Sequence, residues 1–195
     1  MTKAEKNIER VQKLIKTFPD DRYDRVQHMM DTKIGEYYFT APASSRESHH
    51  CAWPGGLVEH SLNVVASLWR LAKDLCPDRW PKHKLAFVGL FHDLGKVGDG
   101  EVERYVPHPS QWHRERGNIY EINPEMPFME HADGSIYILQ KYGVTLDFDE
   151  YVAIRTHDGQ YHPNNTSYKM REPDLSLLLH WSDMWSCKQE KKGGL

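Results

Sequence analysis

The stretch that decides the fold is LAFVGLFHDLGK, residues 85–96. An almost wholly apolar run ends there in a histidine followed by an aspartate, which predicts a buried helix over 82–94. Adjacent helical residues lie about 100° apart around the axis, so His92 and Asp93 can both reach one ion in the wedge between them. Asp93 has two oxygens and could bridge two ions. Gly95 suits a left-handed cap at the end of this helix.

A helical period close to 3.6 recurs along the rest of the chain. Leu57, Val64 and Leu68 lie on the apolar face of a long helix that Cys76-Pro77-Asp78 ends. Further helices are predicted over about 3–16, 21–31, 129–142, 147–157 and 173–188, with Pro173 in a first-turn position. Strand signals are weak, and only TSYKM, residues 166–170, could pair briefly. The sequence therefore predicts an all-α fold.

The 195 residues suit a single structural domain. Within it, residues 1–48 are expected to form a helical extension packed on a core domain of residues 49–195. Residues 97–128 differ from their flanks because they are rich in glycine, proline and aromatic residues. They are interpreted as a long ordered insertion. Long loops in compact domains tend to be functional or disordered, so this segment is a candidate for function.

Composition limits the compartment and the partners. Three scattered cysteines cannot build a disulfide framework, which fits a reducing, cytoplasmic setting. No stretch approaches the roughly 18 apolar residues of a membrane helix, so a soluble protein without a membrane partner is expected. A formal net charge of -3 argues against tight binding to duplex nucleic acid. The oligomeric state is left open.

Each of five predicted helices carries an imidazole, a carboxylate or both in apolar surroundings. His60 lies three residues after Leu57 and four before Val64, so it faces the core. Taken singly, such a residue is as readily a satisfied core histidine or a capping aspartate. Taken together they point to metal, because ionised carboxylates are rarely buried unless they are paired or bound to metal. The full set has four histidines and two aspartates, a composition that borderline divalent metals prefer: His60, His92, Asp93, His131, His157 and Asp183.

The order of these six residues on an all-α chain resembles the HD-domain metal phosphohydrolase superfamily in its six-ligand, two-metal form. HDLGK is a specific version of the central motif of that superfamily. The segment APASSRESHHCAWPGGLVEHS, residues 41–61, is similar to the entry segment of the HD domain in bacterial 3′-5′ exoribonucleases and in some conjugative relaxase-associated proteins. With SQWHRERGNIYEIN and AIRTHDGQY, the chain resembles small stand-alone HD proteins of phages and bacteria, which would place a phage-encoded protein in the host cytoplasm.

The resemblance implies a helical bundle that holds two divalent ions, drawn from Mn, Fe, Co, Ni and Zn, with Mg also allowed. One ion would take His60, His92, Asp93 and Asp183, and the other would take Asp93, His131 and His157. A water or hydroxide between the ions would attack phosphorus. Lys96 resembles the family lysine that steadies a phosphate oxygen, and its alternative role is that of a cation at a helix C-terminus.

His49 and His50 precede the Gly55-Gly56 turn and do not fit the six-ligand set. The resemblance places one of them near the substrate phosphate, as proton donor to the leaving group or as hydrogen-bond donor. The alternative is a pair of side chains that fix a loop. Asp93, Lys96 and these two histidines are therefore the candidate catalytic residues, whereas Gly55-Gly56 is expected to supply positive φ or a close backbone approach.

The insertion carries the candidate substrate contacts. Tyr105, Trp112 and Tyr120 could stack on a base, and Arg114 or Arg116 could bind phosphate. The same composition fits an ordinary lid packed by its own aromatic residues. Other polar residues near the motifs receive lesser roles. His108 and His113 are expected at the surface or in the lid, and Asp158 is a candidate for orienting an imidazole. His180 is expected on the helix surface or behind the ligands, and the resemblance gives His162 and His180 no firm ligand role.

Four functions remain open at this point. The leading one is hydrolysis of a phosphate ester or anhydride in a nucleotide, either a nucleoside monophosphate or a deoxynucleoside triphosphate. The second is a phosphodiesterase acting on cyclic nucleotides, or a 3′-5′ exonuclease acting on short oligonucleotides. A di-iron oxygenase of the HD type and a non-enzymatic metal staple or nucleotide sensor are lesser alternatives.

Overall fold

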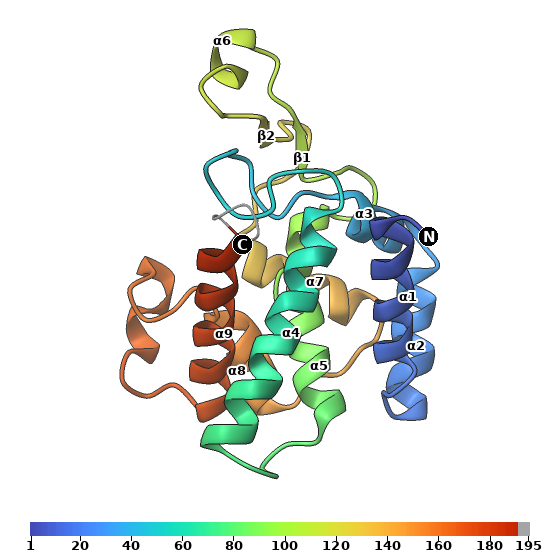
Figure 1. Ribbon diagram of the computed structural model, residues 1–195, viewed down its shortest axis with the longest axis vertical. Coiled ribbons are helices and arrows are strands. Elements are labelled where there is room, and N and C mark those ends of the chain that lie inside the picture. The colour runs from blue at the N-terminus through green and yellow to red at the C-terminus, as the bar shows by residue number, and fades with distance from the viewer. Residues whose placement is uncertain (191–195) are drawn as a thin grey trace.

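The computed structural model describes residues 1–190, and the end of the predicted core domain, residues 191–195, lies outside them. Helix α4 (Gly56–Leu75) packs against α5 (Lys82–Phe91) and α9 (Asp174–Glu190), as Figure 1 shows. Helices α7 (His131–Lys141) and α8 (Phe148–Thr156) pack on each other, and α8 also packs on α9. The prediction of an all-α fold is confirmed, since the described strands form only one small sheet. Within the same residues, no helix is both long and apolar enough to cross a membrane.

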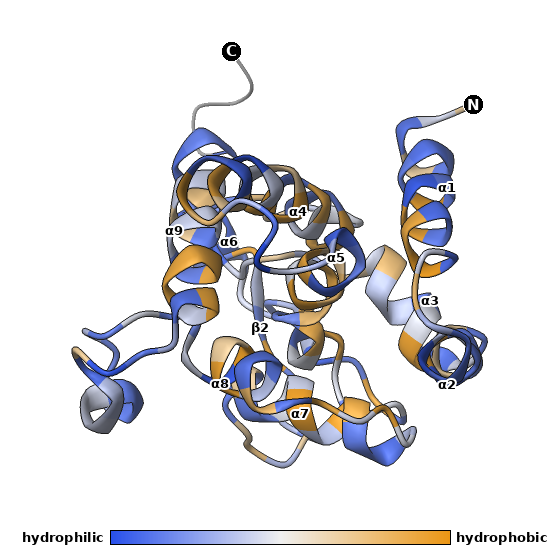
Figure 2. Ribbon diagram, turned by 90° about the horizontal axis from the view of Figure 1, so that it is seen from below, coloured by the Kyte–Doolittle hydropathy of each residue, from blue (hydrophilic) through white to orange (hydrophobic). Residues whose placement is uncertain are grey.

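The core forms around α5, because every residue from Leu85 to Phe91 is buried. Tyr38 is also fully buried, and its hydroxyl donates a hydrogen bond to the Leu90 carbonyl at 2.9 Å. Figure 2 shows hydrophobic positions along α5 and on one side of α4 in orange. Helices α1 (Lys3–Ile15), α2 (Asp20–Met30) and α3 (Lys33–Thr40) contribute side chains to the same hydrophobic cluster. The division at residue 48 stays a prediction.

Two local predictions are wrong. Residues 166–170 do not pair as a strand, because most of them belong to a 3-10 helix, η2 (Pro163–Tyr168). Gly95 is not a left-handed cap, since α5 ends at Phe91 and Gly95 lies inside a second 3-10 helix, η1 (Leu94–Val97), without a positive φ. This glycine instead allows close packing. A Cβ atom there would lie 2.1 Å from the His131 carbonyl oxygen.

The insertion is ordered as a projecting arm, defined here as residues 103–123. Its base is an antiparallel hairpin of β1 (Tyr105–Pro107) and β2 (Tyr120–Ile122), and its tip holds the short helix α6 (Gln111–Arg114). Figure 1 shows the arm standing beyond one end of the bundle. The arm is bonded to the entry loop, residues 41–55, because the Ile119 amide donates to the Ser45 carbonyl at 3.1 Å and the Glu47 amide donates to the Gly117 carbonyl at 2.8 Å.

The Gly55-Gly56 turn behaves as predicted. Gly55 has a φ of 77°, which favours glycine. A Cβ atom at Gly56 would lie 1.9 Å from the Cys51 carbonyl oxygen, so only glycine allows the entry loop to close against the start of α4. The turn therefore sets where the entry loop lies relative to His60, one turn further along the helix.

Candidate metal centre

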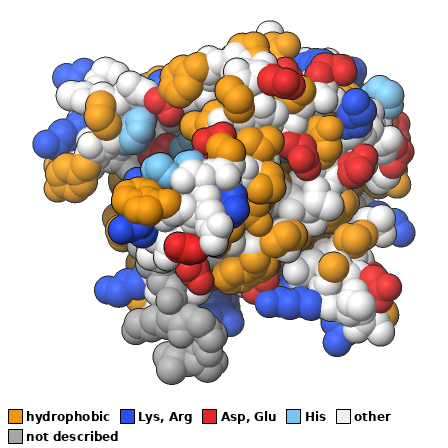
Figure 3. Space-filling view, turned by 90° about the horizontal axis from the view of Figure 1, so that it is seen from above, with side chains coloured by type: hydrophobic (Ala, Val, Ile, Leu, Met, Phe, Trp, Pro, Cys, Tyr) orange, Lys and Arg blue, Asp and Glu red, His pale blue; other side chains and the backbone are white. Residues whose placement is uncertain are grey.

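Residues in or beside five helices form one cluster, and most of the six predicted residues lie at helix boundaries. His92 caps the C-terminus of α5, His157 caps the C-terminus of α8, and His131 is the first residue of α7. Asp93 directly follows His92. His60 lies in the second turn of α4 and Asp183 lies on α9, which packs against it. The structure thus brings all six together. Figure 3 looks onto the end of the molecule that carries the arm, where histidine side chains reach the surface beside hydrophobic and charged ones.

Asp93 stands at the middle of the cluster and divides it into two groups. Its Oδ2 atom lies 3.7 Å from His60 Nε2 and 3.5 Å from His92 Nε2. Its Oδ1 atom lies 3.4 Å from His131 Nε2 and 3.3 Å from His157 Nε2. Asp183 Oδ1 completes the first group, at 3.0 Å from His60 Nε2 and 3.9 Å from His92 Nε2. One carboxylate therefore serves two sets of donors.

The imidazole rings are anchored through Nδ1. His92 Nδ1 donates to the Gly89 carbonyl at 3.0 Å, and His157 Nδ1 donates to the Ile154 carbonyl at 2.7 Å. In the neutral form of either ring, the proton on Nδ1 leaves the lone pair on Nε2, which is the atom that faces Asp93. Each ring is thus held in the tautomer and orientation that a metal ligand requires.

The donor set fits divalent metal ions. His92 Nε2 and Asp93 Oδ1 are buried and form no hydrogen bond within the described residues, and such groups are costly to bury without a partner. Donor atoms of Asp93, His131 and His157 all lie within 4.8 Å of one another, as do those of His60, His92 and Asp93. Imidazole and carboxylate donors together suit borderline divalent metals.

Burial and neighbouring charges shift the pKa values of the cluster in both directions. Burial raises the pKa of Asp93, but Lys96 and His92 outweigh it and hold that pKa well below its usual range. Burial lowers the pKa of His92 to about 4, so this ring is neutral near pH 7. His60 and His157 differ. Burial lowers the pKa of His60, but the neighbouring carboxylates Asp183 and Glu190 more than compensate and raise it to about 10. Burial likewise lowers the pKa of His157, but Asp158 and Asp93 raise it to about 9.

Metal binding is expected to release protons from His60 and His157, and to strengthen as the pH rises. The pKa of about 10 keeps His60 protonated in the metal-free chain near neutral pH, whereas a metal ligand must be neutral. Below that pKa, the affinity should rise up to about tenfold per pH unit for each proton released. Calorimetric titration with Mn²⁺ in two buffers of different ionisation enthalpy measures the proton count. An affinity that does not change between about pH 6 and pH 8 would contradict this prediction.

Lys96 and His50 face the cluster from its edge. Lys96 Nζ lies 2.7 Å from Asp93 Oδ2, and the Tyr105 phenol of the arm is close enough to act on Lys96 electrostatically. The His50 ring lies 4.6 Å from the His60 ring, and its Nε2 is buried and has no hydrogen bond to residues 1–190. Burial is the largest of the causes that lower the pKa of His50 to about 3. The ring is therefore neutral near pH 7, which suits a hydrogen-bond donor better than a cationic general acid. His49 is exposed on the entry loop.

Most of the predicted substrate contacts are engaged within the arm. Arg114 Nη1 donates to the carbonyls of His108 and Pro109, and the Arg116 guanidinium stacks 3.6 Å over the Trp112 ring. Trp112 itself is 56% exposed, which leaves its ring available to a ligand at the tip.

Two further predicted substrate contacts, Tyr105 and Tyr120, lie at the base of the arm. The histidines expected in the lid lie nearer its tip. Tyr120 is half-buried in β2, and Tyr105 at the base of the arm acts electrostatically on Lys96. His108 and His113 stack on each other with ring centroids 4.4 Å apart. Their place in the arm agrees with the lid role expected for them.

Three nearby residues add contacts that the sequence did not reveal. Asp158 Oδ2 lies 3.4 Å from His131 Nε2, so it faces the metal-binding nitrogen and stands where a further ligand would, not behind the ring. Glu190 Oε2 lies 2.9 Å from His60 Nδ1. His180 Nδ1 donates to the His157 carbonyl at 2.8 Å. The sequence could have identified Glu190 by its spacing, because it lies seven residues after Asp183 and therefore two helical turns along the same face.

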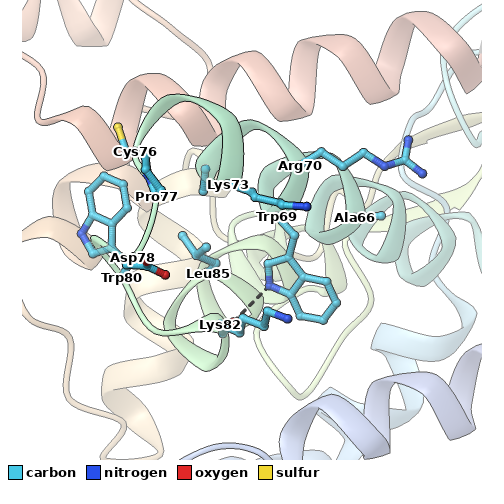
Figure 4. A pocket seen from close by; sticks show the side chains of 11 residues that line it. Ala66, Trp69, Arg70, Lys73, Cys76, Pro77, Asp78, Trp80, Lys82 and Leu85 are labelled. Carbon is cyan, nitrogen blue, oxygen red and sulfur yellow. Dashed lines mark hydrogen bonds between the residues drawn. The ribbon is translucent and has the colours of Figure 1, made fainter.

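A groove of about 450 Å³ lies at the other end of α4 (Figure 4). Trp69 and Trp80 line it together with Arg70, Lys73 and Lys82, and Trp69 Nε1 donates to the Lys82 carbonyl at 3.1 Å. None of the six residues of the cluster lines this groove, so it is separate from the candidate metal centre.

The chain matches the model of a known protein family. A family model described as HD domain matches residues 57–183, from the start of α4 to Asp183. The matched range includes all six residues of the cluster and the whole arm. No curated protein and no solved structure matches the chain.

Proposed function

The chain belongs to the HD-domain family, since the match covers more than half of it, and we propose that it hydrolyses a phosphate ester or anhydride of a nucleotide with metal-activated water. Members of this family are in general metal-dependent phosphohydrolases. The observation that carries the proposal is the position of Asp93, whose two oxygens face two separate pairs of imidazole nitrogens.

The residues present suit two ions. His60, His92, Asp93 and Asp183 would hold the first, and Asp93, His131 and His157 would hold the second, with Asp158 beside it. Bound there, divalent ions supply a nucleophilic water and neutralise the charge that develops on the phosphate oxygens. The side chains of His131 and Asp183 are 18% and 16% exposed, so the cluster is not wholly enclosed.

The surrounding side chains position the substrate. Lys96 is a cation at the cluster, where it can pair with a non-bridging phosphate oxygen. His50 can donate a hydrogen bond from Nε2 if that nitrogen carries its proton, and this nitrogen has no competing partner. Tyr105 reaches the same edge from the arm, where its ring can contact a base or sugar.

Lys96→Met is expected to lower turnover about 100-fold with little loss of bound metal, because it removes one cation from the transition state and no metal donor. Lys96→Arg keeps the charge and serves as the matched control, with a smaller effect. Steady-state rates and the metal content of each purified variant are the measurements. Unchanged turnover in the methionine variant would leave Lys96 as a structural partner of Asp93.

A mononucleotide is the favoured substrate. The chain has a net charge of -3, and Arg114 and Arg116 are already bonded within the arm, which leaves little positive surface to follow a long polymer. One observation supports the alternative of a cyclic-nucleotide phosphodiesterase or a 3′-5′ exonuclease on short oligonucleotides. The exposed Trp112 ring, backed by Arg116, offers a stacking surface for a further base.

A substrate panel tests the choice. Nucleoside monophosphates, deoxynucleoside triphosphates, cyclic nucleotides and end-labelled oligonucleotides are incubated with the chain and Mn²⁺, Fe²⁺, Co²⁺, Ni²⁺ or Zn²⁺. The proposal predicts hydrolysis of a mononucleotide, with product chromatography identifying the cleaved bond. Cleavage of oligonucleotides without turnover of any mononucleotide would establish the alternative. Turnover that requires oxygen and iron would replace both with an oxygenase.

A further inference from the structure

We propose that Glu190 positions His60 for metal binding, by accepting the proton of Nδ1 and so directing the Nε2 lone pair at the first ion. The inference rests on the proposed function, because it requires His60 to be a ligand. It assigns a role to the end of α9, beyond Asp183, where the family match stops.

Both oxygens of Glu190 are engaged. Oε2 lies 2.9 Å from His60 Nδ1, and Oε1 accepts a hydrogen bond from Asn63 Nδ2 at 2.8 Å. The side chain is only 6% exposed. Because a carboxylate can only accept, the contact requires the proton on Nδ1, and the two bonds together fix the carboxylate against α4.

His60 is anchored differently from the other buried rings of the cluster. His92 and His157 donate Nδ1 to backbone carbonyls three residues earlier in their own segments, so their orientation needs no other side chain. His60 is anchored instead by a carboxylate 130 residues away in the sequence. A carboxylate behind a ligating histidine fixes the tautomer and strengthens the other nitrogen as a donor.

Helix α9 holds the His60 ring from both sides. Asp183 Oδ1 lies 3.0 Å from Nε2, and Glu190, two turns later on the same face, lies against Nδ1. Between them, Cys187 Sγ donates to Asp183 Oδ1 at 3.3 Å. One helix thus supplies a candidate ligand together with the residue that orients a second one.

A purely structural role for Glu190 would be to tie the end of α9 to α4 through Asn63. Glu190→Ala removes both contacts, Asn63→Ala removes only the tie, and Glu190→Gln keeps a neutral acceptor for the Nδ1 proton. Positioning predicts that Glu190→Ala weakens metal affinity about 10- to 100-fold. It also predicts a smaller loss for Glu190→Gln and little loss for Asn63→Ala. Gln189→Ala, a neighbouring change that touches no residue of the cluster, is the matched control.

The experiment titrates Co²⁺ into chelator-treated protein, and follows the visible absorption of the bound ion together with competition against a fluorescent chelator. Thermal unfolding of each metal-free variant shows whether it is folded, and Glu190→Gln decides the result if the alanine variant is not. If wild-type protein binds no Co²⁺, the proposed function fails. If wild-type protein binds it and both Glu190 variants match Gln189→Ala in affinity and spectrum, Glu190 has no positioning role and the proposed function stands.

Discussion

Replacing Asp93 with asparagine is expected to lower turnover about 1000-fold or more. The carboxylate faces both donor groups, so the change removes an anionic oxygen from one ion and leaves the other with a weaker bridge. Loss of metal-based stabilisation worth ~4 kcal/mol corresponds to three powers of ten in rate. Rates on the best substrate of the panel, together with metal content by mass spectrometry, are the measurements.

A matched control separates this effect from a general change of charge. Asp24→Asn makes the same substitution at an exposed position on α2 and should leave both rate and metal content as in wild type. Asparagine is nearly the same size as aspartate, so the Asp93 variant should keep its helical content. If turnover is retained in Asp93→Asn, the metal-hydrolase mechanism is wrong.

Gly95→Ala is expected to destabilise the protein by about 3 kcal/mol and to disturb the second donor group. The new Cβ would lie 2.1 Å from the His131 carbonyl oxygen and 2.8 Å from the Ser135 amide nitrogen, and both are backbone atoms of α7. Helix α7 must move away from η1, and His131 at its first residue moves with it. Urea unfolding gives the stability, and metal titration gives the number of ions bound per chain.

Gly117→Ala is the control for this glycine. It lies in the arm with a φ of 81°, and a Cβ there would make only ordinary contact with the Glu47 side chain, at 3.6 Å, so its cost is backbone strain of roughly 1–2 kcal/mol, and metal binding should not change. A Gly95 variant that is as stable as wild type and binds metal normally would show that α7 does not pack as the structure has it.

The helices that position the cluster could be predicted because their apolar residues recur with helical spacing. Periodicity did not reveal the shorter helices and strands. Helix α3 has eight residues and was not predicted, and the strands of the arm have three residues each, too few for alternation to show. Their pairing depends on bonds to the entry loop, which is distant in sequence. Gly95 was misread because a glycine after a helix suggests a cap, whereas its role is set by α7 across the core.

Spacing in the sequence identifies the face of a helix that a residue occupies, but not what its side chain meets. The six residues of the cluster could be grouped from their apolar surroundings and their order. Asp158 could not be placed relative to the His131 ring, because the two lie on different elements whose approach is set by packing. Similarly, Arg114 and Arg116 read as free cations in the sequence, whereas the fold of the arm directs one to backbone carbonyls and the other to an indole ring.

Adding metal back to chelator-treated protein while following nucleotide hydrolysis tests the metal-dependent mechanism most directly. The six-residue cluster predicts no turnover without metal and recovery that saturates at about two ions per chain. The Asp93→Asn variant should not recover at any metal concentration that saturates the wild type. Hydrolysis that continues at the full rate in the metal-free chain would contradict the assignment of the cluster as the catalytic centre.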